Sequence, residues 1–175
     1  ARLIFVAPAD SLSSSYFNDT MKSLSIENVS VSELVHGALV YEFLDNFNTP
    51  APDILDSTEV FLEIPTQTSV SKFALSTQFV NNYAGSSSLS NIPFNNKAGE
   101  SLTATFKYHS QTMEGSYTIN IKLRDCIPGE YNNGGKCEEC PESTFSLSPE
   151  VPCALCLPNT KCSKRSEICP NPGFW

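Results

Sequence analysis

The residues with the strongest chemical signature in this chain are its seven cysteines, because all of them lie in the last fifty positions and none in the first 125. Thiols at this density, roughly one residue in seven, are typical of small extracellular domains that use disulfides in place of an apolar core. The sequence therefore predicts a cross-linked tail in an oxidising, extracellular setting. The cysteines are Cys126, Cys137, Cys140, Cys153, Cys156, Cys162 and Cys169.

These cysteines recur in three similar units, which begin at Cys126, Cys140 and Cys156. The first two units have a proline just after the first cysteine, an aromatic residue five positions after it, and a Cys-x-x-Cys pair at the end; the third unit is shorter. Each unit is too small to bury a core of its own. Covalent closure must therefore supply the stability that burial cannot.

Zinc is the alternative chemistry for these thiols, because two Cys-x-x-Cys pairs could supply four thiolate ligands. Only twelve residues separate the pairs, whereas such pairs usually stand roughly 15–20 residues apart. Three further cysteines would also have no role. A redox pair is disfavoured because neither pair opens a helix in a βαβ context. We expect disulfides and no metal, with one cysteine left over and the connectivity open.

The remaining reactive side chains give no catalytic pattern. His36 and His109 are the only histidines and stand 73 positions apart, outside any recognised catalytic frame. The eight glycines are scattered and form no phosphate-binding loop. Five carboxylates could offer oxygen ligands to calcium, but without a calcium-loop pattern, so solvation explains them better. These are Asp45, Asp53, Asp56, Glu59 and Glu63. We expect no enzyme and no cofactor.

Two sequons predict N-linked glycans on Asn18, in Asn18-Asp19-Thr20, and on Asn28, in Asn28-Val29-Ser30. A sequon has meaning only in a secreted protein, and the cysteine-rich tail favours that setting. The net charge of −8 and the lack of a basic run argue against nucleic acid as a partner. No stretch approaches the roughly 20 apolar residues that span a bilayer. The start at Ala1 suggests a mature segment or a fragment.

Short runs of alternating apolar and polar residues fill the first 125 positions, and no sustained helical period appears. We expect strands near 3–6, 23–31, 38–45, 60–64, 73–79, 102–108 and 117–123, a polar loop over 83–91, and at most one helical turn over 32–37. Such a series predicts a mostly β chain, with an immunoglobulin-like antiparallel β-sandwich followed by a small disulfide-rich tail. The expected parts are an extension over 1–20, the sandwich over 21–125, and the cysteine-rich repeats over 126–175.

The first strand, Leu3, Ile4, Phe5 and Val6, exceeds what a sandwich of about 100 residues needs. An apolar strand of this kind could complete the open sheet edge of a neighbouring copy through main-chain hydrogen bonds. A head-to-tail contact does not close on itself, so it would propagate a fibre. The alternative is that this strand pairs within its own domain.

Two resemblances extend these predictions. Residues 38–48 and 114–119 resemble the immunoglobulin-like repeats of filamin and of bacterial invasins, in which a strand ends in Asp-x-aromatic-Asn and Gly-x-Tyr opens the last strand. The Cys-x-Pro-Gly-Glu-Tyr at 126–131, the Cys-x-x-Cys-Pro at 137–141 and the closing 169–175 resemble ephrin-receptor-type cysteine-rich repeats, as found in large surface proteins of ciliates and other protists. This order implies an extracellular, non-catalytic ectodomain.

The second resemblance also implies a disulfide pattern. It favours Cys126–Cys137 and Cys140–Cys153, with Cys156 bonded to Cys162 or to Cys169. The leftover thiol would pair with chain beyond residue 175 or with another molecule. This sequence departs from the repeat at Glu142-Ser143, where a glycine is usual, and in its odd cysteine.

The function that fits these features is a structural or adhesive segment of an extracellular glycoprotein, with copies joined end to end into a surface filament. One alternative is a ligand-binding receptor ectodomain with the cysteine-rich tail as a spacer or as a ligand platform. Another is a carbohydrate-binding accessory module, in which Tyr83 and Tyr131 would stack on sugar rings.

Overall fold

The computed structural model describes residues 2–5, 14–51, 58–66, 68–80, 84–111, 113–163 and 165–174. The chain is mostly β and divides into two compact units. The first, called the sandwich below, consists of 1–29, 33–94 and 101–122. The second, called the cysteine-rich unit, consists of 30–32, 95–100 and 123–175. Residues 14–18, expected in a separate extension, are thus part of the sandwich.

The smaller sheet of the sandwich has four antiparallel strands in the order β1-β4-β8-β7. These strands are β1 (Arg2–Phe5), β4 (Ala38–Leu44), β7 (Thr77–Val80) and β8 (Ala84–Ser88). The strand β1 pairs with β4 of its own chain, with Leu3 opposite Phe43 and Phe5 opposite Tyr41. The strand β1 thus has a pairing partner in its own chain for Leu3, Ile4 and Phe5, which is the intrachain alternative. Donation of this strand to a neighbouring copy stays a prediction, and Val6 lies outside the described residues.

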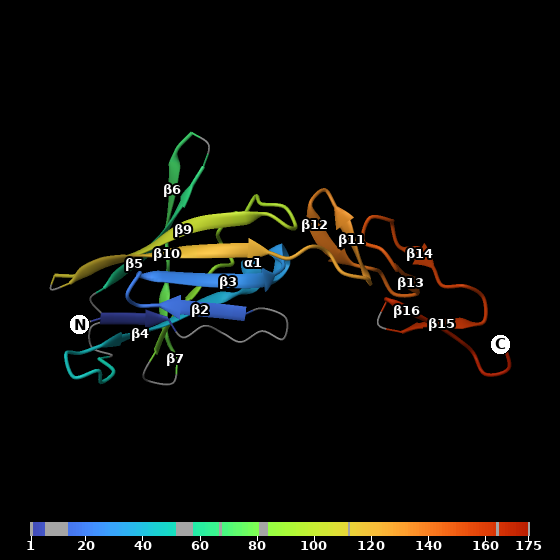
Figure 1. The fold of residues 1–175 in the computed structure, drawn as a ribbon, viewed down its shortest axis with the longest axis horizontal. Helices are drawn as coiled ribbons and strands as arrows, with labels where there is room; N and C mark the ends of the chain where they lie inside the picture. Colours follow the sequence, from blue (N-terminus) through green and yellow to red (C-terminus); the bar gives the residue numbers. More distant parts are fainter. Residues whose placement is uncertain are drawn as a thin grey trace. The chain divides into compact units, whose positions relative to one another are not determined.

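The larger sheet has six strands in the order β2-β3-β10-β9-β5-β6. They are β2 (Ser14–Asn18), β3 (Ser23–Val29), β5 (Glu59–Pro65), β6 (Val70–Ala74), β9 (Ser101–His109) and β10 (Glu114–Leu123). The arrows of β3 and β10 point the same way in Figure 1, whereas the other described pairs are antiparallel. The short helix α1 (Val31–His36) falls close to the helical turn expected over 32–37.

The core lies between the two sheets, which pack face to face as a sandwich. The strand β9 buries every second residue, as the alternation in its sequence predicts. Phe106 on β9 is fully buried and meets Tyr41 on β4, with ring centroids 5.1 Å apart in an edge-to-face arrangement. The Tyr41 hydroxyl lies 2.9 Å from the hydroxyl of Ser87, so both buried hydroxyls have a hydrogen-bond partner.

Two strand predictions differ from the structure. The strand expected over 73–79 is two strands, β6 and β7, which belong to different sheets and are separated at Leu75, itself buried. The polar loop expected over 83–91 contains β8, although its sequence is Ala-Gly-Ser-Ser-Ser. A serine is tolerated at the fully buried position 87 because its hydroxyl has a hydrogen-bond partner in the Tyr41 hydroxyl. Tyr41 is distant in the sequence, so a local pattern does not reveal this partner.

The cysteine-rich unit contains three two-stranded hairpins, one for each cysteine unit. They are formed by β11 (Glu130–Asn133) with β12 (Lys136–Glu139), β13 (Thr144–Phe145) with β14 (Ala154–Leu155), and β15 (Thr160–Ser163) with β16 (Glu167–Pro170). In the first hairpin the turn residues Gly134 and Gly135 both have positive φ, as a tight two-residue turn requires. Within the described ranges, no helix is both long and apolar enough to cross a membrane.

Candidate functional site

The disulfides of the cysteine-rich unit are the first feature with functional meaning. The structure joins Cys126 to Cys137, Cys140 to Cys153 and Cys156 to Cys162, with Cα atoms 5.2, 5.7 and 6.0 Å apart. The first two are the pairs that the resemblance to cysteine-rich repeats implies, and Cys162 is one of the two partners it allows for Cys156.

Cys169 is thus the leftover cysteine, and in the structure it is a free, exposed thiol. Its expected bond to chain beyond residue 175 or to another molecule stays a prediction. Strand pairing places Cys162 and Cys169 differently. Cys169 lies opposite Lys161 in the β15–β16 hairpin, whereas Cys162 lies opposite Ile168. Residues opposite each other share a face and neighbours along a strand alternate, so the two cysteines project from opposite faces of the hairpin.

This pairing leaves the zinc alternative without ligands. Each Cys-x-x-Cys pair contributes its two cysteines to two different disulfides, so no thiolate remains at either pair. One described group, Cys126 with Glu130 and Cys137, has its ligand atoms within 4.8 Å of one another. Its two sulfurs are bonded to each other and its carboxylate is bound by Arg124, so these atoms already serve a structural role.

Each cysteine unit begins with the same backbone turn. The residue three positions after the first cysteine has a left-handed conformation in all three units: Gly129 at φ 92°, Ser143 at 64° and Asn159 at 59°. The carbonyl of this residue accepts a backbone hydrogen bond, which in the first two units comes from the cysteine that begins the next unit and in the third comes from Asn171. The three donors are the amides of Cys140, Cys156 and Asn171, at 2.9, 3.0 and 2.8 Å. Ser143 thus keeps the backbone that glycine has in the first unit, despite the departure from the usual sequence.

A second set of backbone hydrogen bonds ties each unit to the one that follows. The amide of Gly129 donates to the carbonyl of Ser146 at 2.8 Å, and the amide of Asn132 donates to that of Pro149 at 3.0 Å. Ser146 in turn donates its amide to Arg165, also at 3.0 Å. Because main-chain groups make these contacts, the connection depends little on side-chain identity. The three units form one continuous hydrogen-bonded stack.

A buried ion pair anchors the chain where it enters this stack. The Arg124 guanidinium donates to both carboxylate oxygens of Glu130, at 2.7 and 2.8 Å, and the two side chains are only 10% and 13% exposed. The amide of Ile127 also donates to Glu130, at 3.1 Å. These donors, above all the Arg124 guanidinium, lower the pKa of Glu130 below its usual value. Sequence reasoning missed this pair, although an arginine and a glutamate flank the first cysteine.

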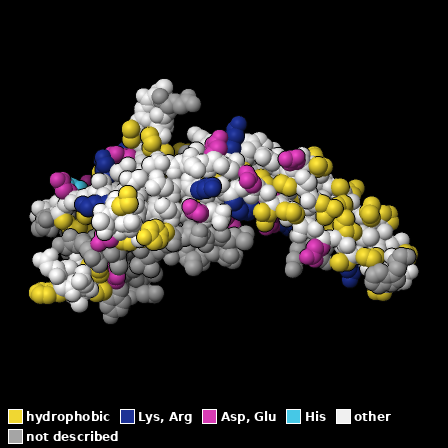
Figure 2. All heavy atoms as spheres, in the orientation of Figure 1, with side chains coloured by type: hydrophobic (Ala, Val, Ile, Leu, Met, Phe, Trp, Pro, Cys, Tyr) yellow, Lys and Arg dark blue, Asp and Glu magenta, His cyan; other side chains and the backbone are white. Residues whose placement is uncertain are grey.

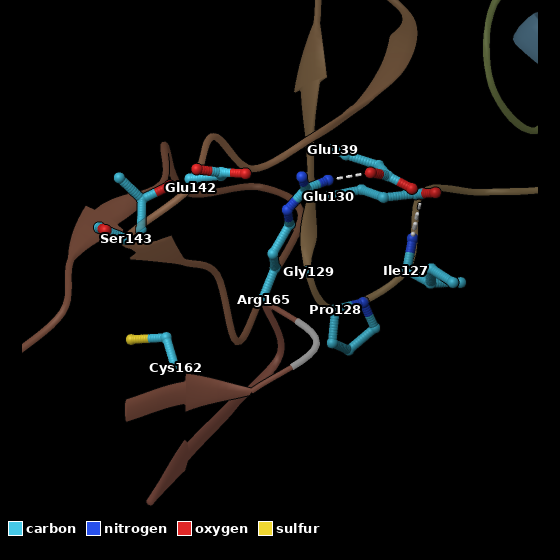
Figure 3. Close-up of a pocket in the computed structure, with 10 residues that line it drawn as sticks. Ile127, Pro128, Gly129, Glu130, Glu139, Glu142, Ser143, Cys162 and Arg165 are labelled. Carbon is cyan, nitrogen blue, oxygen red and sulfur yellow. Dashed lines mark hydrogen bonds and ion pairs between the residues drawn. The ribbon is translucent and has the colours of Figure 1, made fainter. Parts of the chain in front are cut away.

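The same unit contains a cleft of about 560 Å³, drawn in Figure 3. Arg165 points across it to an ion pair with Glu139, which connects the third cysteine unit with the first. Of the other lining groups, Glu130 is bound by Arg124 and the Cys162 sulfur is in a disulfide. Glu130, Glu139, Cys162 and Arg165 thus already have partners, and the Arg165–Glu139 ion pair joins two cysteine units across the cleft. The lining residues are Ile127, Pro128, Gly129, Glu130, Glu139, Glu142, Ser143, Thr144, Cys162 and Arg165.

The carboxylates considered above as calcium ligands are not brought together in the described part of the sandwich. Asp45 accepts hydrogen bonds from the amides of Phe47 and Thr49, at 2.7 and 2.9 Å, and from the Thr49 hydroxyl at 2.6 Å. That hydroxyl is the main reason why the pKa of Asp45 is lowered. Glu63 pairs instead with Lys107 at 2.8 Å, and Glu59 lies at the exposed start of β5. Asp53 and Asp56 lie outside the described residues.

Both sequon asparagines also have a local structural role. The side-chain oxygen of Asn18 accepts the amide of Met21 at 3.0 Å and closes the turn after β2. Asn28 is exposed and has φ 58°, a conformation that asparagine tolerates better than most residues. A glycan is attached through the amide nitrogen, so the Asn18 cap and a glycan are chemically compatible. Glycans on Asn18 and Asn28 stay predictions.

The remaining candidate side chains are separated. His36 ends α1, whereas His109 ends β9, where its imidazole lies 3.6 Å from the Glu114 carboxylate with both side chains exposed. The hydroxyl of Tyr131, proposed above for sugar stacking, donates to Glu138 at 2.7 Å; Tyr83 lies outside the described residues.

In comparison with known proteins, no family model and no curated protein matches this sequence. The resemblances to filamin-type and ephrin-receptor-type repeats therefore stay predictions.

Proposed function

We propose that this chain is a non-catalytic structural or adhesive segment of an extracellular glycoprotein, and that its copies join end to end into a surface filament. The cysteine-rich unit carries the proposal. Its three disulfides hint at an oxidising compartment, and backbone hydrogen bonds connect all three cysteine units into one stack. A continuous, covalently closed stack suits a segment that must transmit force along a surface fibre.

The resistance of this unit to extension follows from its loops. The disulfides close sequence separations of 11, 13 and 6 residues, which makes 30 residues in all. At about 3.4 Å per extended residue, these loops withhold roughly 80–100 Å of chain from a pulling force. A tether with this property keeps its length under load even after its hydrogen bonds have broken.

Imaging of secreted protein tests the filament part of the proposal. We expect negative-stain images of the oxidised protein to show uniform fibres, and peptide mass spectrometry without reduction to find the three disulfides together with glycan mass on Asn18 or Asn28. A protein that stays monomeric in sedimentation up to about 100 µM would contradict end-to-end assembly.

Single-molecule pulling tests the structural part. We expect the final contour length of the chain to increase by roughly 80–100 Å after reduction, the length that the loops withhold. A Cys140→Ser/Cys153→Ser variant serves as the matched control, because opening its 13-residue loop alone should release roughly two fifths of this length. An unchanged contour length after reduction would argue against a load-bearing disulfide stack.

A further inference from the structure

The strand β2 forms one border of the six-stranded sheet. It pairs with β3 from Ser14 opposite Glu27 to Asn18 opposite Ser23, and no described strand lies on its other side. A border strand of this kind presents main-chain N–H and C=O groups on which a strand of another molecule can pair. In the described part of the chain, β2 is therefore a place where two copies could join side by side.

The sequence of β2 lacks the charge and the proline that commonly protect a border strand from such pairing. The strand at the opposite border, β6, carries the exposed Lys72, whose ammonium lies 3.6 Å from the centre of the Phe61 ring. By contrast, β2 reads Ser-Ser-Tyr-Phe-Asn, and residues 11–18 contain neither a charged residue nor a proline. A short, uncharged segment with aromatic residues has a high tendency to pair with copies of itself.

Both sequons of the chain lie in the hairpin that ends at this border. The chain has fourteen asparagines, but only Asn18 and Asn28 are in sequons. Asn18 is the last residue of β2. Asn28 directly follows Glu27, which pairs with Ser14 at the other end of the strand. Because Asn28 is five positions along the chain from Ser23, the partner of Asn18, the two asparagines stand roughly 16 Å apart. The sequons thus bracket the pairing length of β2.

The side chains at both ends are placed to carry glycans. Along β2, Phe17 faces the core, where its ring lies 5.8 Å from that of the buried Tyr117. Its neighbours Tyr16 and Asn18 therefore face outward, and Tyr16 is 67% exposed. Asn28 is exposed as well, on a part of the molecular surface where Figure 2 shows polar and charged side chains among scattered hydrophobic ones. An N-linked glycan is bulky and solubilising, so glycans at both ends would stand beside the border of β2.

We propose that N-linked glycans on Asn18 and Asn28 cover the border of β2 and keep copies from pairing side by side along this strand. This inference rests on the proposed function, which makes the chain an extracellular glycoprotein, and it assigns a role to the glycans. The chain's own glycans are the favoured occupants of this border because the two sequons of the sequence lie at its two ends. With β2 covered, association is confined to contacts elsewhere on the molecule, and a filament stays single instead of pairing laterally with its neighbours.

Removal of the sequons tests this role. Thr20→Ala abolishes the first sequon and leaves the Asn18 side chain that closes its turn, whereas the matched control Thr20→Ser keeps the sequon. Asn28→Gly abolishes the second, since glycine readily adopts the φ of 58° at this position. We expect secreted Thr20→Ala/Asn28→Gly protein to associate roughly tenfold or more strongly than Thr20→Ser protein in sedimentation. Hydrogen exchange should show new protection over 14–18 in the associated form.

A charge on the border distinguishes pairing along β2 from other effects of lost glycans. Tyr16→Lys in the glycan-free protein should restore the weak association of the control, because charged side chains disfavour pairing at a sheet edge. Trimming of the folded wild-type glycoprotein to one sugar per site should strengthen association in the same way, without any change of sequence that could impair folding.

Two kinds of result would overturn this inference. Equal association of the glycan-free protein, the trimmed protein and the control, or stronger association without protection over 14–18, would refute it and leave the proposed filament standing. Secreted wild-type protein without glycan mass on Asn18 and Asn28 would refute it together with the glycoprotein part of the proposed function.

Discussion

Replacement of Glu130 by glutamine tests the ion pair at the start of the cysteine-rich unit. The change keeps the shape of the side chain but leaves the charge of Arg124 without its partner, at a site where the two side chains are 10% and 13% exposed. Removal of one partner from a buried pair destabilises a protein by about 3–5 kcal/mol. We expect a loss of this size in the free energy of opening of the first cysteine unit.

Hydrogen exchange measured by mass spectrometry on peptides from 126–140 gives this free energy locally. The matched control is Glu63→Gln, which breaks the more exposed pair with Lys107, where the side chains are 22% and 40% exposed. Exposed pairs contribute about 0–1 kcal/mol, so sandwich peptides of this control should change little.

A double variant distinguishes the stabilisation that the ion pair contributes from the free-energy cost of leaving one buried charge without a partner. With Arg124→Leu and Glu130→Leu together, no buried charge remains, and such replacements are often close to neutral. We expect the double variant to be more stable than either single leucine variant, which is a coupling that a mutant cycle measures. A loss below about 1 kcal/mol for Glu130→Gln, similar to the exposed control, would refute the reasoning.

Three further outcomes are expected. Because the pKa of Glu130 is lowered from 4.5, its contribution to stability is complete above that pH and is lost as the pH falls through the lower folded pKa; pH-corrected exchange of 126–140 should show this loss, and Glu130→Gln should abolish it. Gly115→Ala should cost about 1–3 kcal/mol in thermal unfolding of the sandwich, since the new Cβ would lie 2.6 Å from Cζ of the buried Tyr108. Ser143→Gly should stabilise the cysteine-rich unit by up to about 1 kcal/mol, because Ser143 has φ 64°, whereas Glu142→Gly should destabilise it; equal melting temperatures for these two variants would contradict this account.

Much of the fold was predictable because its signals are local. The alternation in β9 and β10 is a period-two pattern, and the structure buries one face of each strand accordingly. The cysteine density indicated a disulfide-rich tail. The strands that were missed, β2 and β8, contain serines in place of an apolar alternation. Patterning cannot find such strands, since the contacts that place them come from other parts of the chain.

The candidate site was predictable to a smaller extent. The sequence identified the cysteines, but only the structure shows the backbone hydrogen bonds that connect the three cysteine units. Ser143 shows why: its residue type departs from glycine, yet its carbonyl accepts the amide of Cys156 just as that of Gly129 accepts Cys140.

The sequence by itself determined the β character of this protein, the place where its cross-linked tail begins and the spacing of its repeats, because alternation and cysteine order are properties of neighbouring residues. Only the tertiary structure decided which cysteine bonds to Cys156, where β1 pairs, and which backbone hydrogen bonds connect the three cysteine units. Those outcomes depend on contacts between distant residues, such as Tyr41 with Ser87, 46 positions apart. Folding selects such contacts by packing and hydrogen-bond satisfaction, and no short stretch of the chain encodes either one alone.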